Sequence, residues 1–183
     1  MSNLYRICCA GFGGQGVMSM GQLLAYAGMI EDKNVTWCPS YGPEMRGGTA
    51  NCSVIISDKP ITTPVVSSNA TSVVVMNEAS FDKFVKIAEP NGSVYINSSL
   101  VKRKVERKDV RVYYIHANDI AVELGNPKLI NIIMLGALIE NEKMVEAESI
   151  IEAFKKVFGV AKERFIPINR EALKKGSEIV KQF

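Results

Sequence analysis

The chain has 183 residues, of which 47% are hydrophobic and 22% charged, so it suits one domain over residues 1–183 and excludes extensive disorder. Its 22 basic and 19 acidic residues leave a net charge of +3, too mild to indicate a nucleic-acid-binding protein. No apolar run is long enough to span a membrane and the N-terminus lacks a signal peptide, so we expect a cytoplasmic protein that contacts no membrane.

The spacing of apolar residues predicts strands and helices that alternate along most of the chain. Strands are expected at Leu4–Ala10, Asn34–Cys38, Thr49–Ser57, Ser72–Met76, Ser93–Asn97 and Val110–His116. Helices are expected at 14–30, 78–89, 120–124, 126–140, 146–158 and 169–182. Pro90-Asn91-Gly92 is expected to end the second helix, and Asn118-Asp119 to cap the third. This order predicts a three-layer α/β/α fold with a mostly parallel, Rossmann-like sheet and a helical C-terminal part.

The predicted helix 126–140 has a wide apolar stripe that is typical of a core helix. The stripe consists of Ile130, Ile133, Met134, Ala137 and Leu138. Gly136 lies beside it and permits close packing against a neighbouring element.

The run Gly11 to Gly16 follows the first predicted strand and opens the first predicted helix. Gly11, Gly13 and Gly16 match the G-x-G-x-x-G spacing, which permits a tight turn and close approach of backbone N–H groups to an anion. Dinucleotide-binding folds also need an acidic residue at the end of the second strand, roughly 20 residues further on. That strand ends in Cys38-Pro39 without a carboxylate, so the motif indicates an anion site and not an NAD site. The spacing leaves two interpretations open, a turn that holds a phosphate and a turn that binds nothing.

A second glycine-rich loop runs from Ser40 to Thr49, directly after the second predicted strand. In a parallel sheet it lies at the same edge as the first loop, where ligand crevices form. Arg46 has a planar guanidinium that suits a carboxylate or a phosphate, and Glu44 could pair with it or with a partner. By residue type alone, a surface turn with a solvated ion pair is favoured.

The remaining reactive side chains indicate no redox or metal centre. Cys8, Cys9, Cys38 and Cys52 lack the spacing of metal ligands, and we interpret them as small buried apolar residues. The single histidine, His116, ends a predicted strand without a partner defined by the sequence. A structural or solvent-exposed role is therefore favoured over proton transfer.

A charged segment, 102–109, separates the last two predicted strands. No aromatic residues lie between Lys102-Arg103-Lys104 and the following Arg107 and Lys108, which argues against a platform for single-stranded nucleic acid. We interpret the segment as a solvated loop, with attraction of an acidic protein, a phosphate-bearing ligand or RNA as the alternative.

Two motifs together resemble a known family. G-x-G-G-Q-G at 11–16 and S-Y-G-P-E-M-R-G-G-T at 40–49 closely resemble the gamma subunit of 2-oxoacid:ferredoxin oxidoreductases. The resemblance covers the whole chain, including Gly125-Asn126-Pro127 and the segment from Asn131 to Ala137, which looks like a later helical segment of the family. Tyr41, Met45 and Gly47-Gly48 are more similar to the 2-oxoglutarate or branched-chain 2-oxoacid type than to the pyruvate type.

The resemblance implies a part in the oxidative decarboxylation of a 2-oxoacid with coenzyme A, giving acyl-CoA, carbon dioxide and reduced ferredoxin. It also implies thiamine diphosphate with magnesium between alpha and beta subunits, and 4Fe–4S clusters on beta and delta subunits. The chain has neither G-D-G followed by paired asparagines nor repeated C-x-x-C. We therefore expect it to bind no cofactor alone and to be inactive without its partner subunits.

In such a complex the gamma domain packs on the alpha subunit near the entrance for coenzyme A. The expected contact residues are Gly11, Gly13, Gly14, Gln15 and Gly16 of the first loop and Ser40, Tyr41, Glu44, Arg46, Gly47 and Gly48 of the second. We expect Arg46 to contact an alpha-subunit carboxylate or a CoA phosphate, and we expect no catalytic residue and no metal ligand. Two alternatives stay open: a stand-alone nucleotide-binding enzyme or sensor, and a 2-oxoisovalerate or indolepyruvate oxidoreductase subunit of the same family.

Overall fold

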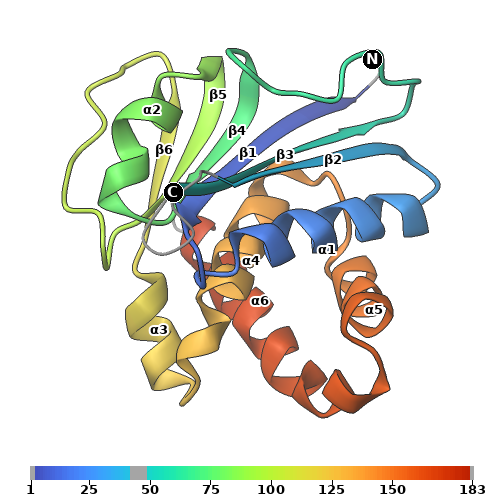
Figure 1. Cartoon of the computed structure of the whole chain (residues 1–183). Helices are drawn as coiled ribbons and strands as arrows, with labels where there is room; N and C mark the ends of the chain where they lie inside the picture. Colours follow the sequence, from blue (N-terminus) through green and yellow to red (C-terminus); the bar gives the residue numbers. More distant parts are fainter. Residues whose placement is uncertain (1–2, 42–48, 182–183) are drawn as a thin grey trace.

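A single mixed β-sheet forms the centre of the computed structural model, which describes residues 3–41 and 49–181 (Figure 1). Its six strands lie in the order β2-β3-β1-β4-β5-β6. β3 is antiparallel to both of its neighbours, whereas β1, β4, β5 and β6 are mutually parallel. Only β3 therefore runs in the opposite direction among the six strands described. The predicted, mostly parallel sheet is confirmed. The strands span Leu4–Phe12 (β1), Asn34–Tyr41 (β2), Thr49–Ser57 (β3), Ala70–Val75 (β4), Ala88–Asn97 (β5) and Arg111–Ile115 (β6).

Strand β4 shows how the sequence specifies the sheet. Val73, Val74 and Val75 are completely buried because β4 lies between β1 and β5 and both of its faces are covered. Val74 belongs to the core on the side of α1, and its two neighbours belong to the core on the opposite face. A continuous apolar run is the pattern that a strand covered on both faces requires.

Helices cover the two faces of the sheet unequally. One face carries α1, α4, α5 and α6, and the other carries the short α2 and the segment 98–110 (Figure 1). The three layers and the helical C-terminal part are as predicted. The helices span Val17–Ile30 (α1), Phe81–Val85 (α2), Ala117–Glu123 (α3), Ile130–Glu142 (α4), Ala147–Phe158 (α5) and Ile166–Val180 (α6). Short 3-10 turns precede α2, α4 and α6 at Glu78–Ser80, Pro127–Leu129 and Val160–Phe165.

Helices α4 and α6 pack with their backbones in direct contact. A Cβ atom on Gly136 would overlap the carbonyl group of Leu173, and one on Gly176 would overlap that of Ile133. Glycine is required at both positions because any side chain would force the two helices apart. The close packing predicted at Gly136 is confirmed, and Gly176 is its counterpart on α6.

The predicted helix 78–89 is wrong in its second half. α2 is short, and β5 already begins at Ala88. The reason is strand pairing, because the Ala70 N–H donates to the Ile87 carbonyl oxygen at 2.9 Å and Ala70 pairs with Ala88 in the ladder. Pro90-Asn91-Gly92 lies inside β5, where the register with β4 shifts and the asparagine adopts a left-handed φ of 65°. These residues form an irregular stretch of strand and do not end a helix.

The cap predicted for the helix after His116 is also wrong. α3 begins immediately after His116, so Asn118 and Asp119 lie in its first turn, and no side-chain hydrogen bond caps it. Asn118 Oδ1 accepts a hydrogen bond from Asn97 Nδ2 at 2.8 Å, and the Asp119 carboxylate accepts one from the Ser99 hydroxyl at 2.9 Å. Both side chains therefore connect α3 to the chain at the end of β5.

Candidate site at the glycine loop

The first glycine loop follows β1 and leads into α1. Gly14 and Gly16 have left-handed φ angles of 93° and 75°, which residues with side chains rarely adopt. Gly11 has no space for a side chain, because a Cβ there would lie 2.7 Å from Gln15 Oε1 and 2.8 Å from Met76 Cβ. Glycine is therefore needed at these three positions for the turn itself, whether or not the loop holds a ligand.

The Gln15 side chain fills the space between the ends of β1 and β4. Its Oε1 accepts a hydrogen bond from the Phe12 N–H at 2.7 Å, and its Nε2 donates to the Met76 carbonyl oxygen at 3.2 Å. Asn77 Nδ2 donates to the same Oε1 at 3.4 Å. β1 and β4 are adjacent parallel strands from which the chain continues to opposite sides of the sheet, and the crevice at their carboxyl ends is where dinucleotides bind in Rossmann-type sheets. An amide that occupies this position argues against a dinucleotide bound in the Rossmann manner.

Asn131 connects the glycine loop to the start of α4. Its side chain is nearly buried, and Nδ2 donates to the Gly16 carbonyl oxygen at 3.4 Å. The contact is close, because a Cβ on Gly16 would lie 2.6 Å from this nitrogen. The starts of α1 and α4 are therefore held side by side, and the positive ends of two helix dipoles meet at one place.

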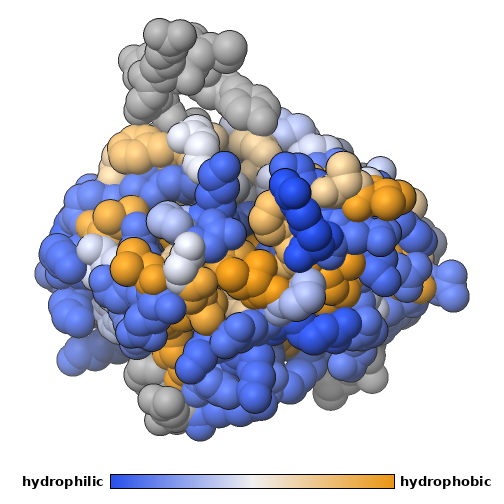
Figure 2. Space-filling model, turned by 90° about the horizontal axis from the view of Figure 1, so that it is seen from below, coloured by the Kyte–Doolittle hydropathy of each residue, from blue (hydrophilic) through white to orange (hydrophobic). Residues whose placement is uncertain are grey.

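A cavity of about 380 Å³ opens between the glycine loop and the C-terminal helices. Gly14, Gln15 and Gly16 form one wall, and the segment 126–132 at the start of α4 forms another. The space-filling view from below shows apolar side chains gathered between hydrophilic ones on the helical side of the molecule (Figure 2). The size of the cavity is that of a small-molecule site.

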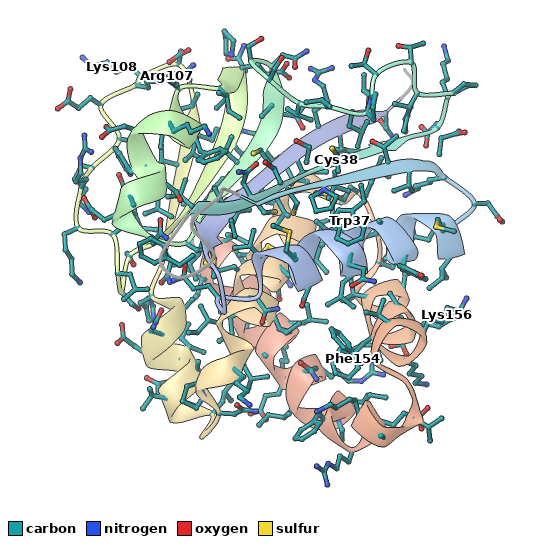
Figure 3. All side chains as sticks on the ribbon, in the orientation of Figure 1. Trp37, Cys38, Arg107, Lys108, Phe154 and Lys156 are labelled. Carbon is teal, nitrogen blue, oxygen red and sulfur yellow. The ribbon has the colours of Figure 1, made fainter. Side chains whose placement is uncertain are left out.

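The far wall of this cavity is aromatic and basic. Phe154 and Phe158 of α5 have ring centroids 4.8 Å apart, and Lys162 Nζ lies 5.6 Å from the ring centroid of Phe165. Lys128 adds a second cation to the lining. Phe154 is directed into the molecule from α5 (Figure 3). Rings, lysines and helix N-termini in one cavity suit a ligand that has a planar ring and a phosphate.

The second predicted loop is attached at the same edge of the sheet. Tyr41 at the end of β2 pairs with Ala50, and Thr49 at the start of β3 pairs with Phe12 at the end of β1. The expected reason holds, because β1 and β2 are both antiparallel to β3 and therefore run in the same direction, so their carboxyl ends lie at one edge. Ser40 is exposed on β2. Nothing is described for the side chain of Tyr41, and Glu44, Arg46, Gly47 and Gly48 lie outside the described residues.

Sequence reasoning missed several residues of the site. The hydrogen bond of Asn131 to Gly16 joins positions 115 residues apart, and its segment stood out only through the family resemblance. Phe154 and Phe158 are spaced like core residues of α5. The sequence does show that this aromatic pair is followed by Gly159 and then Lys162. In the structure Gly159 ends the helix with a left-handed φ of 73°.

The other candidates from the sequence do not line this cavity. His116 is exposed at the end of β6. The charged segment is bound to the body of the protein by its arginines, because Arg103 pairs with Asp82 at 2.7 Å and Arg107 donates to the Ala88 carbonyl oxygen at 2.8 Å. Arg107 and Lys108 lie together on the connection that leads to β6 (Figure 3). The segment is thus in part an anchored connection rather than a freely solvated loop.

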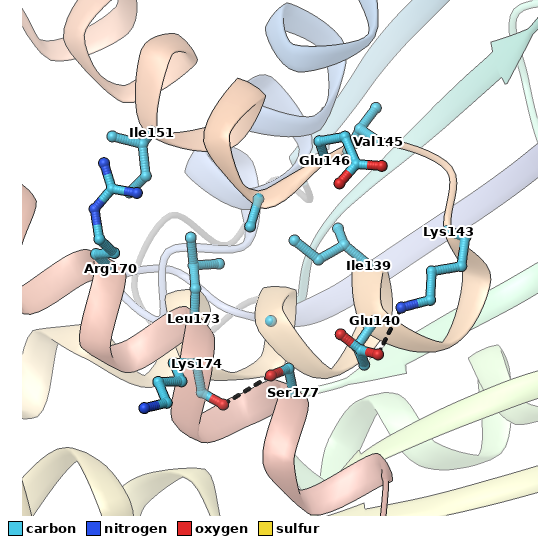
Figure 4. Close-up of a pocket in the computed structure, with 12 residues that line it drawn as sticks. Ile139, Glu140, Lys143, Val145, Glu146, Ile151, Arg170, Leu173, Lys174 and Ser177 are labelled. Atoms are coloured by element: carbon cyan, nitrogen blue, oxygen red, sulfur yellow. Dashed lines mark hydrogen bonds and ion pairs between the residues drawn. The ribbon is translucent and has the colours of Figure 1, made fainter.

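A second cavity, of about 280 Å³, lies among α4, α5 and α6 (Figure 4). Its lining is apolar in the centre and charged at the rim. The cations of the rim already have carboxylate partners, namely Lys143 with Glu140, Arg170 with Glu148 and Lys174 with Glu178. Paired charges attract an anion weakly, so this cavity suits a phosphate-bearing ligand less well than the cavity at the glycine loop.

Cys8, Cys9 and Cys52 are buried as predicted, whereas Cys38 on β2 is partly exposed. Among residues 3–41 and 49–181, no group of three or more histidine, cysteine, aspartate or glutamate side chains is placed to hold a metal ion. Within the same ranges, no helix combines the length and hydropathy that crossing a membrane requires.

Comparisons with known proteins place this fold in a family. Residues 6–179 match the family described as pyruvate ferredoxin/flavodoxin oxidoreductase. The chain is 36% identical over 174 residues to ketoisovalerate oxidoreductase subunit VorA of Methanothermobacter thermautotrophicus, which covers 94% of this chain but 36% of that protein. It is also 36% identical over 151 residues to 2-oxoglutarate synthase subunit KorC of Methanocaldococcus jannaschii, covering 81% of this chain and 80% of that one. The chain thus spans little more than a third of the ketoisovalerate relative and most of the 2-oxoglutarate relative.

Solved structures agree with this assignment. The keto/oxoacid ferredoxin oxidoreductase gamma subunit from Geobacter sulfurreducens superposes with a TM-score of 0.82 at 27% identity, over 98% of this chain and 99% of that one. The 2-oxoglutarate:ferredoxin oxidoreductase from Magnetococcus marinus gives a TM-score of 0.84 over all of this chain and 31% of that one, and its 21% identity supports the shared fold alone. The chain therefore belongs to the pyruvate ferredoxin/flavodoxin oxidoreductase family, within which it matches a gamma subunit over nearly its whole length.

Proposed function

We propose that this chain is the gamma subunit of a 2-oxoacid:ferredoxin oxidoreductase that converts a 2-oxoacid and coenzyme A into acyl-CoA, carbon dioxide and reduced ferredoxin. The observation that carries the proposal is the cavity where the glycine loop, the start of α4 and an aromatic, basic wall meet. Coenzyme A has an adenine ring and phosphates, which match the chemistry of that wall. The amide of Gln15 in the crevice between β1 and β4 supports coenzyme A over a dinucleotide bound in the Rossmann manner.

The part of this chain in the reaction is to bind and position. Lys128 and Lys162 attract the phosphates, the phenylalanines contact the adenine ring, and Asn131 holds the loop at Gly16. We assign thiamine diphosphate, magnesium and 4Fe–4S clusters to alpha, beta and delta subunits, because this sequence lacks the motifs that hold them. On those subunits the cofactors supply decarboxylation and electron transfer to ferredoxin.

Among the 2-oxoacids we propose 2-oxoglutarate as the substrate. Two observations support this substrate. The second motif has Tyr41, Met45 and Gly47-Gly48, and a relative named 2-oxoglutarate synthase matches this chain along most of the relative's length. 2-Oxoisovalerate is the alternative within the family, since a relative of equal identity is named ketoisovalerate oxidoreductase. Indolepyruvate is a further alternative substrate within the family.

The test is purification of the native complex through a tag on this chain, under anaerobic conditions. Copurification of the partner subunits and ferredoxin reduction with 2-oxoglutarate faster than with 2-oxoisovalerate, pyruvate or indolepyruvate are the expected results. The isolated chain should reduce no ferredoxin. Copurification with activity on another 2-oxoacid would keep the family role and replace the substrate, whereas the absence of partner subunits would contradict the role itself.

Arg46 tests the second loop. We propose that its guanidinium contacts an alpha-subunit carboxylate or a CoA phosphate, since it lies in the motif that resembles the family. Arg46→Ala is then expected either to weaken assembly of the complex or to raise the Michaelis constant for CoA. Unchanged assembly together with an unchanged Michaelis constant would remove this assignment.

A stand-alone nucleotide-binding enzyme or sensor is the second candidate, favoured by the G-x-G-x-x-G spacing of Gly11, Gly13 and Gly16. Calorimetry of the isolated chain with NAD, FAD, ATP and CoA separates the two. Stoichiometric, tight binding of a dinucleotide by the chain alone would favour the second candidate. Our proposal predicts no such binding, because Gln15 fills the crevice. The cytoplasmic location of the protein stays a prediction from the sequence.

A further inference from the structure

Cys9 and Cys52 face each other across the antiparallel pair β1 and β3. They are direct partners in the ladder, and both side chains are completely buried. The two thiols are hydrogen-bonded to each other. We propose that Cys9 and Cys52 form a thiol-oxidation site, at which a peroxide converts the pair into a disulfide between β1 and β3.

The backbone geometry suits this bond. Residues directly opposite in antiparallel strands have Cα atoms about 4.5–5.5 Å apart, within the roughly 4.4–6.8 Å that disulfides span. Side chains of such a pair also lie on the same face of the sheet, here the face covered by α1. The Cα separation of such a pair therefore suits a disulfide, and the Cβ atoms, about 4.5–5.5 Å apart in opposite pairs, must approach to about 3.5–4.5 Å for the S–S bond to form.

Within this proposal Cys52 is the cysteine that ionises, which requires its S–H to release the Val17 carbonyl oxygen 3.4 Å away. Hydrogen bonds from the Cys9 thiol, the Trp37 indole and the Gly21 N–H stabilise its thiolate and lower its pKa although burial opposes this. The hydrogen bond to Cys52, together with burial, raises the pKa of Cys9, which stays a thiol. One cysteine that ionises beside one that keeps its proton is the arrangement that a stepwise oxidation uses.

Within this proposal a small oxidant approaches Cys52 past Trp37. This side chain is 36% exposed on β2, the edge strand, and it lies between β2 and α1, whereas Cys38 points to the other side of the strand (Figure 3). Gly21 of α1 makes room for the group, since a Cβ there would lie 2.5 Å from Cys52 Sγ and 2.9 Å from Trp37 Nε1. Trp37 is therefore a partly exposed side chain that lies close to the buried Cys52 Sγ at the margin of the sheet.

The reaction balances with hydrogen peroxide as the oxidant. The Cys52 thiolate attacks one peroxide oxygen, the O–O bond breaks, and the other oxygen leaves as hydroxide, which leaves a sulfenic acid on Cys52. The Cys9 sulfur then attacks this sulfur, the S–S bond forms, and the sulfenic oxygen leaves as water with the Cys9 proton. Two electrons pass from the sulfur pair to the peroxide.

Oxidation of the pair would change a hydrogen bond at the start of α1. In the reduced protein the Cys52 S–H donates to the carbonyl oxygen of Val17 at 3.4 Å, and Val17 is the first residue of α1 after the glycine loop. A disulfide has no S–H, so this hydrogen bond is lost and the sulfur turns toward β1. The oxidation state of the two cysteines is thus linked to the anchoring of the glycine loop.

The experiment treats the purified full chain with hydrogen peroxide and follows three readouts. First, we expect the number of thiols titrated after denaturation to fall from four to two. Second, we expect a cross-linked peptide that contains Cys9 and Cys52. Third, we expect a shift in the fluorescence of Trp37, the single tryptophan. Dithiothreitol should reverse all three. The proposal is overturned if both cysteines are still reduced when the partly exposed Cys38 has been oxidised.

Three variants sharpen the result. Cys52→Ser should abolish the cross-link and the response of Trp37, whereas the matched variant Cys38→Ser should keep both. In Cys9→Ser, the sulfenic acid on Cys52 has no partner thiol and should be trapped by dimedone. Circular dichroism of each variant confirms the fold, and peptide mapping of the wild-type chain decides the question if Cys52→Ser does not fold. A cross-link that survives in Cys52→Ser would contradict the assignment.

Discussion

The hydroxyl of Tyr95 donates a hydrogen bond to Glu142 Oε1 at 2.8 Å, beneath the C-terminal end of α4. Tyr95 is completely buried near the C-terminal end of β5, and its ring is stacked on that of Tyr113 with centroids 5.1 Å apart. Asn141 Nδ2 donates to the same hydroxyl at 2.7 Å. The hydroxyl therefore connects the sheet to α4 through two polar partners.

Tyr95→Phe tests this connection. The variant keeps the stacked ring and removes the hydroxyl, so Glu142 and Asn141 each lose a partner in a partly buried place. We expect a loss of about 2 kcal/mol in the free energy of unfolding, measured by urea denaturation. Tyr26→Phe, on the exposed side of α1, is the control and should change little. A change for Tyr95→Phe as small as that of the control would show that the hydroxyl contributes nothing.

Gly136→Ala tests the backbone contact between α4 and α6. The added methyl group would overlap the Leu173 carbonyl, so the helices must separate, and we expect a loss of about 3 kcal/mol in the free energy of unfolding. Gly13→Ala is the control, because a Cβ on Gly13 meets nothing within 4 Å. Equal denaturation midpoints for the two variants would refute the contact.

The pattern of side chains allowed most of the fold to be predicted, because strands such as β4 and helices such as α4 carry their apolar residues at regular spacing. The second half of the predicted helix 78–89 was predicted from the same regular spacing of apolar residues, and it is wrong. Phe81 and Phe84 do lie in α2, but Ala88 fits the helical spacing and belongs to β5, since pairing with Ala70 outweighs a weak local preference.

The site was less predictable than the fold. Glycine spacing predicted the turn at Gly11 to Gly16, because backbone conformation depends on the local sequence. The contacts that define its surroundings, from Gln15 to Met76 and from Asn131 to Gly16, join residues 61 and 115 positions apart, and they depend on how the helices and strands pack. No local pattern contains that information.

The basic segment gives another prediction. The Arg107 guanidinium donates to the carbonyl oxygens of Val85 and Ala88 at 3.1 and 2.8 Å and pairs with Asp109 at 2.6 Å. A lysine has the charge but cannot reach these partners together. Arg107→Lys should therefore lower the midpoint of thermal unfolding, by an amount equivalent to about 1–2 kcal/mol. Lys108→Ala, next in the chain, should leave the midpoint unchanged, and an unchanged midpoint in Arg107→Lys would contradict a stabilising role for the guanidinium hydrogen bonds.

Charge reversal in the two cavities tests the proposed coenzyme A site. Lys162→Glu puts a negative charge into the lining of the cavity at the glycine loop, and in the active complex we expect the Michaelis constant for CoA to rise about tenfold. Lys174→Glu makes the same change in the cavity among α4, α5 and α6 and should leave this constant unchanged. The reverse order of effects would move the CoA site to the second cavity.

The acid sensitivity of the fold is expected to depend on Glu31. Burial raises the pKa of this carboxyl, but hydrogen bonds from the Glu146 N–H, Ser149 and Lys33 outweigh burial, so its pKa lies below the ordinary 4.5. A carboxyl whose pKa is lowered in the folded state contributes stability above the unfolded pKa, and this contribution is lost as the pH falls through the folded pKa.

The free energy of unfolding of the wild-type chain should therefore decline below pH 4.5, and Glu31→Gln should flatten that decline, because the variant has no carboxyl to protonate. Glu163→Gln, an exposed position in the 3-10 turn before α6, serves as the control and should keep the wild-type slope. Urea denaturation at a series of pH values between 3 and 7 measures the slopes, with the window set by the unfolded and folded pKa values. The hydrogen bonds of Glu31 would have no net effect on stability if the slope of Glu31→Gln equals that of the wild type.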